Sequence, residues 1–146
     1  MSEFLDAAFA EAEAAFARGE VPVGAVVVQD RAVIARAGNR VIELADPTAH
    51  AEMLALRAAA AAIGGERLGN CDLYVTLEPC PMCAAASSLA RIRRLTFGAY
   101  DPKGGGVDHG PRIFDQPTCH HRPEVTGGVE ETRAAELLKR FFRDKR

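Results

Sequence analysis

Apolar positions at both ends of the chain recur with the spacing of an amphipathic helix. Between Ser2 and Arg18 they are Phe4, Leu5, Ala8, Phe9, Ala12 and Phe16. Between Glu130 and Arg146 they are Ala134, Leu137, Leu138, Phe141 and Phe142. This spacing gives each segment one apolar stripe, so both are predicted to be helices that pack on a core. Acids in the first turn and bases in the last turn of the second segment agree with the helix dipole.

The segment after the first predicted helix has the pattern of two strands. Residues 21–28 are rich in β-branched side chains, the polar pair Gln29-Asp30 follows, and residues 31–37 resume an apolar pattern. Two such runs joined by a short polar link predict a β-hairpin. Asn39 follows the second run within Gly38-Asn39-Arg40, a position that a plain turn residue often takes.

Helix and strand patterns alternate through the middle of the chain. A helix is predicted over residues 49–63, because its apolar side chains share one face and Gly64-Gly65 follows. Short buried strands are predicted over 73–76 and 95–99, with a helix between them that ends near Ala90. A strand, a helix and a strand with short links predict a right-handed parallel crossover. The carboxyl ends of such strands are where open α/β sheets usually carry their sites.

The chain after the crossover is less regular. Residues 100–116 are loop-like, with the run Asp101-Pro102-Lys103-Gly104-Gly105-Gly106 and a short structured piece at 112–114. A loop of this length within a compact domain is typically functional. Val125-Thr126 is predicted to form a last edge strand before the C-terminal helix.

Two short motifs carry the candidate chemistry. The first is His50-Ala51-Glu52, and the second is Pro79-Cys80-Pro81-Met82-Cys83. His-x-Glu followed by Pro-Cys-x-x-Cys is the pattern of zinc-dependent nucleobase deaminases. Three protein ligands, His50, Cys80 and Cys83, leave a fourth position for water, which is the arrangement of a catalytic zinc. Glu52 is predicted to lie beside the metal without binding it and to act as the general acid and base.

Local geometry gives these side chains a common target. Cys80 and Cys83 are three positions apart, so a helix places both sulfurs on one face, and Pro79 is predicted at the first helical position. The partial positive charge at a helix N-terminus favours thiolates, which are the metal-binding form. The Asp-Pro-Thr run at 46–48 supplies a candidate cap and a first-turn proline for the helix that carries His50. Two helix N-termini are therefore expected to face one zinc ion.

Other interpretations of the same residues stay open. A Cys-x-x-Cys pair alone also occurs in redox sites and in structural zinc sites. A structural zinc would need a fourth protein ligand, for which the candidates are Cys71, Cys119, His120 and His121.

Composition narrows the class of protein. The chain has 146 residues, 48% of them hydrophobic, which fits one domain over residues 1–146 with a core of its own. No apolar run is long enough to span a membrane, and the N-terminus lacks a signal-peptide pattern. Four cysteines, two of them assigned to metal, fit the reducing cytoplasm better than a disulfide framework. The net charge of −2 means that the surface as a whole is not basic, so a nucleic acid would have to bind to local basic patches. The main candidate patch is C-terminal and contains Arg140, Arg143 and Lys145, which are expected on the polar face of the last helix.

Longer stretches resemble the bacterial tRNA-specific adenosine deaminases, a family within the cytidine deaminase-like superfamily. The stretches that carry the resemblance are 21–25, 39–40, 46–52, 73–83, 91–92, 98–101, 125–128 and 141–143. The resemblance implies an α/β protein with a three-layer α-β-α cytidine deaminase-like fold and a mixed five-stranded sheet in the order 2-1-3-4-5. It also implies a homodimer in which both subunits touch the RNA.

The same resemblance implies contacts with the substrate. A flipped adenine is expected to be held by Asn39 and the backbone of Ala51, and the anticodon loop to be approached by Asp101 and Lys103. Further substrate-binding positions that it implies are His121, Phe142 and Arg143.

Two positions depart from the family's usual pattern. His120 stands where many members have asparagine, and Ser87-Ser88 lies where they usually have bulkier apolar residues. The first departure is expected to alter contacts with the nucleotides that flank the target, and the second to weaken slightly the packing of the helix that carries it.

The expected function follows from the motifs and the resemblance. Zinc lowers the pKa of a bound water to about 7. One zinc ion per subunit is expected to activate the water that attacks C6 of adenine, with Glu52 moving the protons. The expected product is inosine at the wobble position of a tRNA anticodon. Two alternatives stay open: a deaminase of a free nucleobase or nucleoside such as cytosine or guanine, and a non-catalytic RNA-binding module stabilised by zinc.

Overall fold

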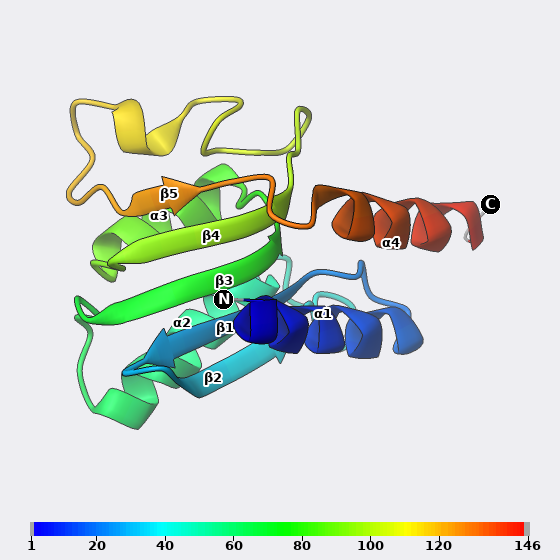
Figure 1. Ribbon diagram of the computed structural model, residues 1–146, viewed down its shortest axis with the longest axis horizontal. Helices are drawn as coiled ribbons and strands as arrows, with labels where there is room; N and C mark the ends of the chain where they lie inside the picture. Colours follow the sequence, from blue (N-terminus) through cyan, green and yellow to red (C-terminus); the bar gives the residue numbers. More distant parts are fainter. Residues whose placement is uncertain (1, 145–146) are drawn as a thin grey trace.

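The computed structural model describes residues 2–144, which are organised around a five-stranded sheet (Figure 1). Its strands are β1 (Gly24–Gln29), β2 (Ala32–Gly38), β3 (Cys71–Leu77), β4 (Arg94–Ala99) and β5 (Glu124–Thr126). They lie in the order β2-β1-β3-β4-β5. β1 is antiparallel to β2 and β3, while β4 is parallel to β3 and β5 is parallel to β4. The mixed sheet and its expected strand order are therefore confirmed.

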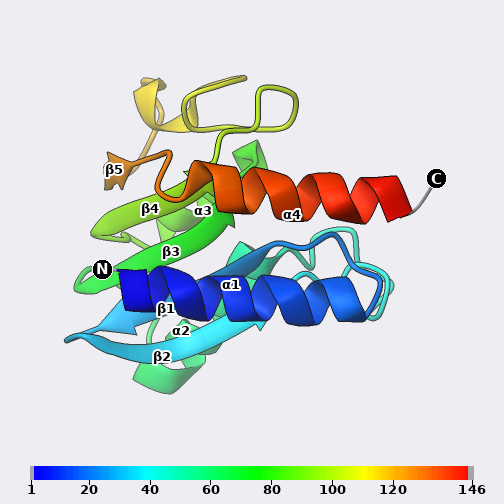
Figure 2. The ribbon, with the colours of Figure 1, turned by 45° about the vertical axis from the view of Figure 1, so that its right-hand side comes forward.

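Two pairs of helices cover the two faces of the sheet (Figure 1, Figure 2). α1 (Ser2–Ala17) and α4 (Glu131–Asp144) lie side by side on one face, and α2 (Ala51–Ile63) and α3 (Pro81–Leu89) cover the other. In β1, Ala25 and Val27 belong to the core under α2, whereas Val26 and Val28 belong to the core under α1. Alternate side chains of a strand point to opposite faces. The strand is therefore buried on both sides, and the expected three-layer α-β-α architecture is confirmed.

The predicted hairpin is present, but its first strand begins at Gly24 and not at residue 21. A Cβ atom at Gly24 would lie 2.5 Å from the backbone nitrogen of Ala12, so only glycine lets α1 pack this closely on the strand. The two strands are joined by Asp30 and Arg31, both with positive φ. Positive φ at both loop residues is what a two-residue type I′ hairpin requires.

The second half of the fold agrees with the predicted order of elements. β3, α3 and β4 form the expected parallel crossover. The short piece expected at 112–114 is one 3₁₀ turn, η1 (Ile113–Asp115), and the expected edge strand is present as β5. The basic residues Lys145 and Arg146 lie outside the described residues. Within residues 2–144, no helix has both the length and the apolar character needed to cross a bilayer.

α4 is held against α1 by aromatic and ionic contacts. Arg140 Nη2 lies 3.1 Å from Glu13 Oε1, and its guanidinium lies 4.9 Å from the centre of the Phe16 ring. Phe16 also meets Phe141 edge-on, with 5.5 Å between the ring centres. Guanidinium groups stack well on aromatic faces. Arg140, which was expected to belong to a basic patch for nucleic acid, therefore also bridges the two helices.

Candidate active site

The start of α2 and the start of α3 bring the two motifs together. His50 directly precedes α2, Cys80 is the N-cap residue of α3, and Cys83 lies in the first turn of α3. His50 Nδ1 lies 3.6 Å from Cys80 Sγ and 3.7 Å from Cys83 Sγ. The ligand atoms of all three residues lie within 4.8 Å of one another. Two helix N-termini therefore meet at one edge of the sheet and place the predicted metal ligands side by side.

α3 starts two residues later than predicted. Pro81, and not Pro79, occupies the start of the helix, and Cys80 precedes it in an extended conformation. The Cys80 sulfur accepts a hydrogen bond from Cys83 N at 3.5 Å, which is the contact of an N-cap side chain. The prediction of Pro79 at the first helical position is wrong, because the capping cysteine must itself lie just outside the helix.

α2 is capped by a residue distant in sequence. The predicted cap candidates pair with each other, since Asp46 Oδ1 accepts hydrogen bonds from N and Oγ1 of Thr48 at 2.8 and 2.7 Å. The helix begins at Ala51, whose N–H donates to Oδ1 of Asn39 at 2.7 Å. Asn39 is therefore the side chain that caps α2 and is more than a plain turn residue. Since its oxygen is used by Ala51, the NH₂ group of the Asn39 amide remains the donor for another partner.

The three predicted ligands fit a tetrahedral zinc ion. Zinc binds histidine nitrogen at about 2.0–2.1 Å and cysteine sulfur at about 2.3 Å, so a tetrahedral ion holds these two ligand atoms about 3.6 Å apart. The observed nitrogen–sulfur distances of 3.6 and 3.7 Å match that separation. One histidine and two cysteines also supply the nitrogen and sulfur donors that zinc prefers.

The candidate fourth ligands of a structural zinc lie elsewhere. Cys71 is buried at the start of β3, whereas the metal-ligand group follows the other end of that strand. Cys119 donates to the backbone oxygen of His121 at 3.2 Å. Among residues 2–144 the metal-ligand group consists of the three predicted ligands and includes none of the four alternatives. The geometry therefore favours an open three-ligand site over a closed structural one.

Charge at the cluster also suits a divalent cation. The Cys83 thiol beside it and the nearby His50 imidazole lower the pKa of Cys80 to about 4, against the opposing effect of burial. The resulting thiolate raises the pKa of Cys83 and that of His50. One negative charge is thus already favoured between the two sulfurs, and a coordinating cation deprotonates such thiols outright.

Glu52 lies in the first turn of α2, where only 4% of its surface is exposed. Burial raises the pKa of its carboxyl to about 7. A general acid–base group works best when its pKa lies near the operating pH. Glu52 lies outside the metal-ligand group, so its carboxyl is available for proton transfer.

A cavity of about 610 Å³ lies beside the cluster and collects most of the predicted site residues. Its wall includes the C-terminal end of α4, the loop after β2 and the loop after β4. The predicted site residues that line it are Asn39, His50, Glu52, Cys80, Asp101 and Phe142. Half of the surface of Phe142 is exposed, and Ile42, another lining residue, is 71% exposed. The cavity therefore combines a partly buried metal-ligand cluster with apolar, solvent-exposed lining residues.

Four predicted substrate-binding residues do not line this cavity: Ala51, which is fully buried at the start of α2, and Lys103, Arg143 and His121. Lys103 belongs to the turn after Asp101, where its N–H donates to Asp101 Oδ1 at 3.2 Å. Arg143 is exposed near the end of α4, with Nε 3.9 Å from Asp144. His121 Nε2 lies 2.8 Å from the backbone oxygen of Ile92. Contacts of these side chains with a substrate remain predictions.

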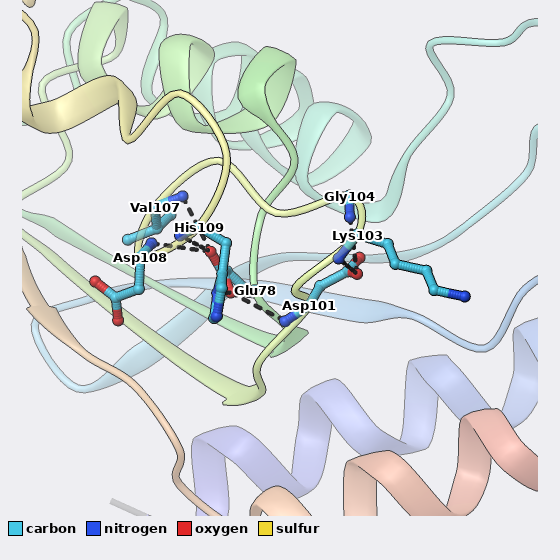
Figure 3. Close-up of polar contacts among 7 residues, drawn as sticks. All are labelled: Glu78, Asp101, Lys103, Gly104, Val107, Asp108 and His109. Atoms are coloured by element: carbon cyan, nitrogen blue, oxygen red, sulfur yellow. Dashed lines mark hydrogen bonds and ion pairs between the residues drawn. The ribbon is translucent and has the colours of Figure 1, made fainter.

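Two buried carboxylates in the cavity wall are not marked by the sequence patterns. Glu20 accepts hydrogen bonds from the N–H groups of Ile42 and Glu43 at 3.1 and 2.8 Å. Glu78 accepts hydrogen bonds from four backbone N–H groups of the loop after β4 (Figure 3). Burial alone would raise the pKa of Glu78, but the hydrogen bonds, led by that from Asp101, outweigh it and lower the pKa. The hydrophobic pattern of a sequence does not distinguish a buried glutamate from an exposed one. The one available signal was that Glu78 directly precedes the cysteine motif.

Known proteins share both the sequence and the fold. Residues 1–99 match the family described as the cytidine and deoxycytidylate deaminase zinc-binding region. A tRNA-specific adenosine deaminase from Agrobacterium fabrum is 59% identical over 145 residues, which cover 99% of this chain and 95% of that protein. The chain belongs to the tRNA-specific adenosine deaminase family. A similar solved structure comes from a study of A-to-I editing by tRNA:A34 deaminases at the wobble position of transfer RNA. The two structures have a TM-score of 0.93 and 59% sequence identity, and their alignment covers 94% of this chain and 100% of the other.

A guanine deaminase, which is not a tRNA-specific enzyme by name, has the same fold. The structure of a guanine deaminase from Bacillus subtilis has a TM-score of 0.68 and 32% identity, with coverage of 95% of this chain and 92% of that one. The zinc-binding deaminase fold therefore does not by itself select the substrate.

The metal site can be tested by removing one ligand at a time. Replacing His50, Cys80 or Cys83 with alanine should abolish zinc binding, measured by elemental analysis of the purified protein, because two ligands hold zinc poorly. Cys119→Ser is the matched control and should retain zinc, since Cys119 lies outside the metal-ligand group. X-ray absorption of the wild-type protein should show two sulfur ligands and one histidine; a fourth protein ligand would contradict the open site.

Proposed function

We propose that this protein hydrolyses adenosine to inosine at the wobble position of a tRNA anticodon, with one zinc ion per subunit. The observation that carries the proposal is a buried glutamate beside a three-ligand metal site in the wall of a cavity of about 610 Å³. Cavities of a few hundred Å³ suit ligands of small-molecule size, so a single base can enter. That the base is adenosine and that it belongs to a tRNA is inferred from the relatives, which are tRNA-specific adenosine deaminases.

The reaction replaces the amino group on C6 of adenine with an oxygen atom from water and releases ammonia. When bound, zinc supplies a water activated at neutral pH. Glu52 would accept one proton of that water and donate it to the ring nitrogen next to C6. It would then take the proton that remains on the newly attached oxygen and donate it to the amino group, which leaves as ammonia. Its raised pKa keeps both protonation states accessible near neutrality. A cation held by His50 and the two cysteines would act in the opposite direction and favour the ionised, basic form of the carboxyl.

The pocket residues suggest how the base is held. Asn39 is fixed by the hydrogen bond from Ala51 to its oxygen, so its NH₂ group is oriented as a donor. We propose that this group donates to a ring nitrogen of the flipped adenine. A carbonyl oxygen of guanine or cytosine can accept the same hydrogen bond, so Asn39 alone does not choose the base. Ala51, whose backbone the resemblance also assigns to the base, is fully buried and donates its N–H to Asn39, so we propose that it acts by holding the Asn39 amide.

A polynucleotide substrate is favoured over a free base by the rim of the cavity. Ile42 and Phe142, which line the cavity, are large apolar side chains with at least half of their surface exposed. Exposed aromatic and apolar side chains provide surfaces on which bases outside a pocket stack. An unpaired loop nucleotide also enters a pocket more cheaply than a paired one, because less stacking and pairing is lost.

Product analysis on a panel of substrates tests the function and the role of Glu52 together. The wild-type protein should form inosine in an anticodon stem-loop with adenosine at the wobble position, and should not deaminate free adenosine, cytidine or guanine at a comparable rate. Glu52→Gln should keep its fold and its zinc while turnover falls by a factor of about 10²–10⁴. Glu3→Gln, on the exposed surface of α1, is the control.

The panel separates the alternatives. Guanine as the preferred substrate would replace the proposal with a free-base deaminase. Tight RNA binding with no product from any substrate would indicate a non-catalytic module. Parallel loss of zinc and activity in Glu52→Gln would contradict its role as proton carrier.

We propose that Lys103, Phe142 and Arg143 contact the anticodon loop around the cavity. Lys139 lies one helical turn before Arg143 on α4, and both are exposed, whereas Arg140 is engaged with α1. Neutralising Lys139 and Arg143 to glutamine should weaken RNA binding and reduce the slope of log affinity against log salt by about 1.4, because two phosphate contacts release fewer counterions. Filter binding over a salt series measures both. Arg36→Gln, on β2, should change neither, and an unchanged slope in the double variant would remove α4 from the RNA surface.

We propose that the protein is a homodimer whose subunits meet through α2 and α3. An apolar groove between these helices is lined by Met53, Leu56 and Leu89, and Leu89 is 60% exposed. Close by, Arg91 Nη1 is buried without a hydrogen-bond partner in the described chain, which a partner subunit's acceptor would relieve. Sedimentation equilibrium should give twice the chain mass of 15.6 kDa, and Leu89→Arg should shift it towards the monomer. A wild-type mass of one chain would contradict the dimer.

We also propose that the protein is located in the cytoplasm. None of its four cysteines forms a disulfide, which fits a reducing compartment.

A further inference from the structure

Glu78 occupies the junction between the sheet and the metal site. It directly follows β3 and stands two residues before the ligand Cys80. Only 1% of its surface is exposed. An ionised carboxylate at such a position is costly to bury unless it is fully hydrogen-bonded, so its partners determine why it is there.

The partners of Glu78 all come from the loop after β4 (Figure 3). Oε2 accepts hydrogen bonds from three successive N–H groups, those of Val107, Asp108 and His109, at 3.1, 2.9 and 3.1 Å. Oε1 accepts from Asp101 N at 3.0 Å and lies 2.8 Å from His109 Nδ1. Five nitrogen atoms therefore face one carboxylate, and the loop from 101 to 109 closes around it.

The same loop lies directly against the metal-binding turn. Gly106 N donates to the backbone oxygen of Pro79 at 2.8 Å. A Cβ atom on Gly106 would lie 2.5 Å from Pro81 N, and one on Gly105 would lie 2.5 Å from Glu78 Oε2. Glycine at both positions allows this close approach, so a shift of the loop and a shift of the metal turn are sterically linked.

The segment that Glu78 holds is part of the cavity wall. Asp101 and Gly104 line the cavity, and Asp101 Oδ1 accepts the N–H groups of Lys103 and Gly104 at 3.2 and 2.9 Å. The hydrogen bond from Asp101 N to Glu78 therefore fixes the whole turn from 101 to 104 relative to Cys80. That turn combines cavity-lining residues with solvent exposure at 102–104, so nucleotides next to a base in the cavity can contact it.

We propose that Glu78 is a positioning residue that sets the distance between the 101–104 wall and the metal ligand Cys80, and thereby the fit of the nucleotides flanking the target base. The effect on activity rests on the proposed function, whereas the effect on the loop does not. A role in fold stability alone predicts a general loosening of the protein; a positioning role predicts a change confined to the loop and to substrate affinity.

Glu78→Gln separates these two roles because an amide has only one acceptor oxygen. Its oxygen can still accept the three N–H groups of residues 107–109, but its NH₂ then faces the N–H of Asp101, which loses its acceptor. In zinc-loaded protein without substrate, amide hydrogen exchange at 101–104 should become at least about tenfold faster, while exchange in β1 and β3 stays unchanged. With the anticodon stem-loop, KM should rise about tenfold, kcat should change less than about threefold, and zinc content should not change.

Asp72→Asn is the matched control. Asp72 is a buried carboxylate on β3 too, paired with Arg93 at 2.9 Å, near the end of the strand away from the metal site. It should lower the melting temperature without changing KM or exchange at 101–104. Gly105→Ala provides a second route, since its new Cβ atom pushes the loop from Glu78 without altering any charge; it should reproduce the faster exchange at 101–104.

The outcomes are distinct. Unchanged exchange at 101–104 in both Glu78→Gln and Gly105→Ala overturns the positioning role, as does a uniform increase in exchange across the sheet. Equal KM for wild type and Glu78→Gln overturns its effect on substrate fit. A wild-type protein inactive on every RNA overturns the proposed function instead, and the exchange data still decide whether Glu78 holds the loop.

Discussion

The site depends on two helices that begin at the same edge of the sheet. α2 enters after β2, which is antiparallel to β1, and α3 leaves from the carboxyl end of β3. In this arrangement His50 Nδ1 lies within 3.7 Å of both cysteine sulfurs. The helix N-termini then contribute partial positive charge to the place where thiolates are required. The metal site is thus a product of sheet topology as much as of the motifs.

Buried carboxylates around this edge differ in what they can do because their hydrogen-bond donors differ. Glu52 is buried, and the pKa of its carboxyl is raised, which suits proton transfer. Glu78 is equally buried but faces five nitrogen atoms, and its pKa is lowered, which suits a fixed anionic anchor. Glu20 holds the backbone of Ile42 and Glu43 in the loop that forms the opposite wall. One side-chain type therefore supplies the proposed proton carrier and two residues that hold the backbone of the cavity wall.

Sequence patterns were sufficient for the parts of the fold that depend on local periodicity. The helices, the hairpin and the crossover appear where apolar spacing and glycine predict them, and the ligand spacing of His50, Cys80 and Cys83 predicts the cluster. The strand order and the three layers came from the family resemblance, since periodicity does not specify which strands pair. Long-range polar contacts were missed: Asn39 caps a helix twelve residues away, and Arg140 pairs with Glu13 across 127 positions. Such contacts depend on tertiary packing, which the local pattern does not contain.

Ser87 and Ser88, which were expected to weaken the packing of α3, are both hydrogen-bonded in the structure. Both hydroxyls are buried and bonded: Ser87 Oγ donates to the backbone oxygen of Cys83 at 2.8 Å, and Ser88 Oγ accepts the N–H of His121 at 2.9 Å. A buried hydroxyl with a partner avoids most of the cost of desolvation, so the expected weakening of α3 is offset by these bonds. The first bond ends on the residue that supplies a metal ligand, and the second ties the segment after η1 to α3. Ser88 thus connects α3 to the chain around His121, a link that an apolar side chain cannot make.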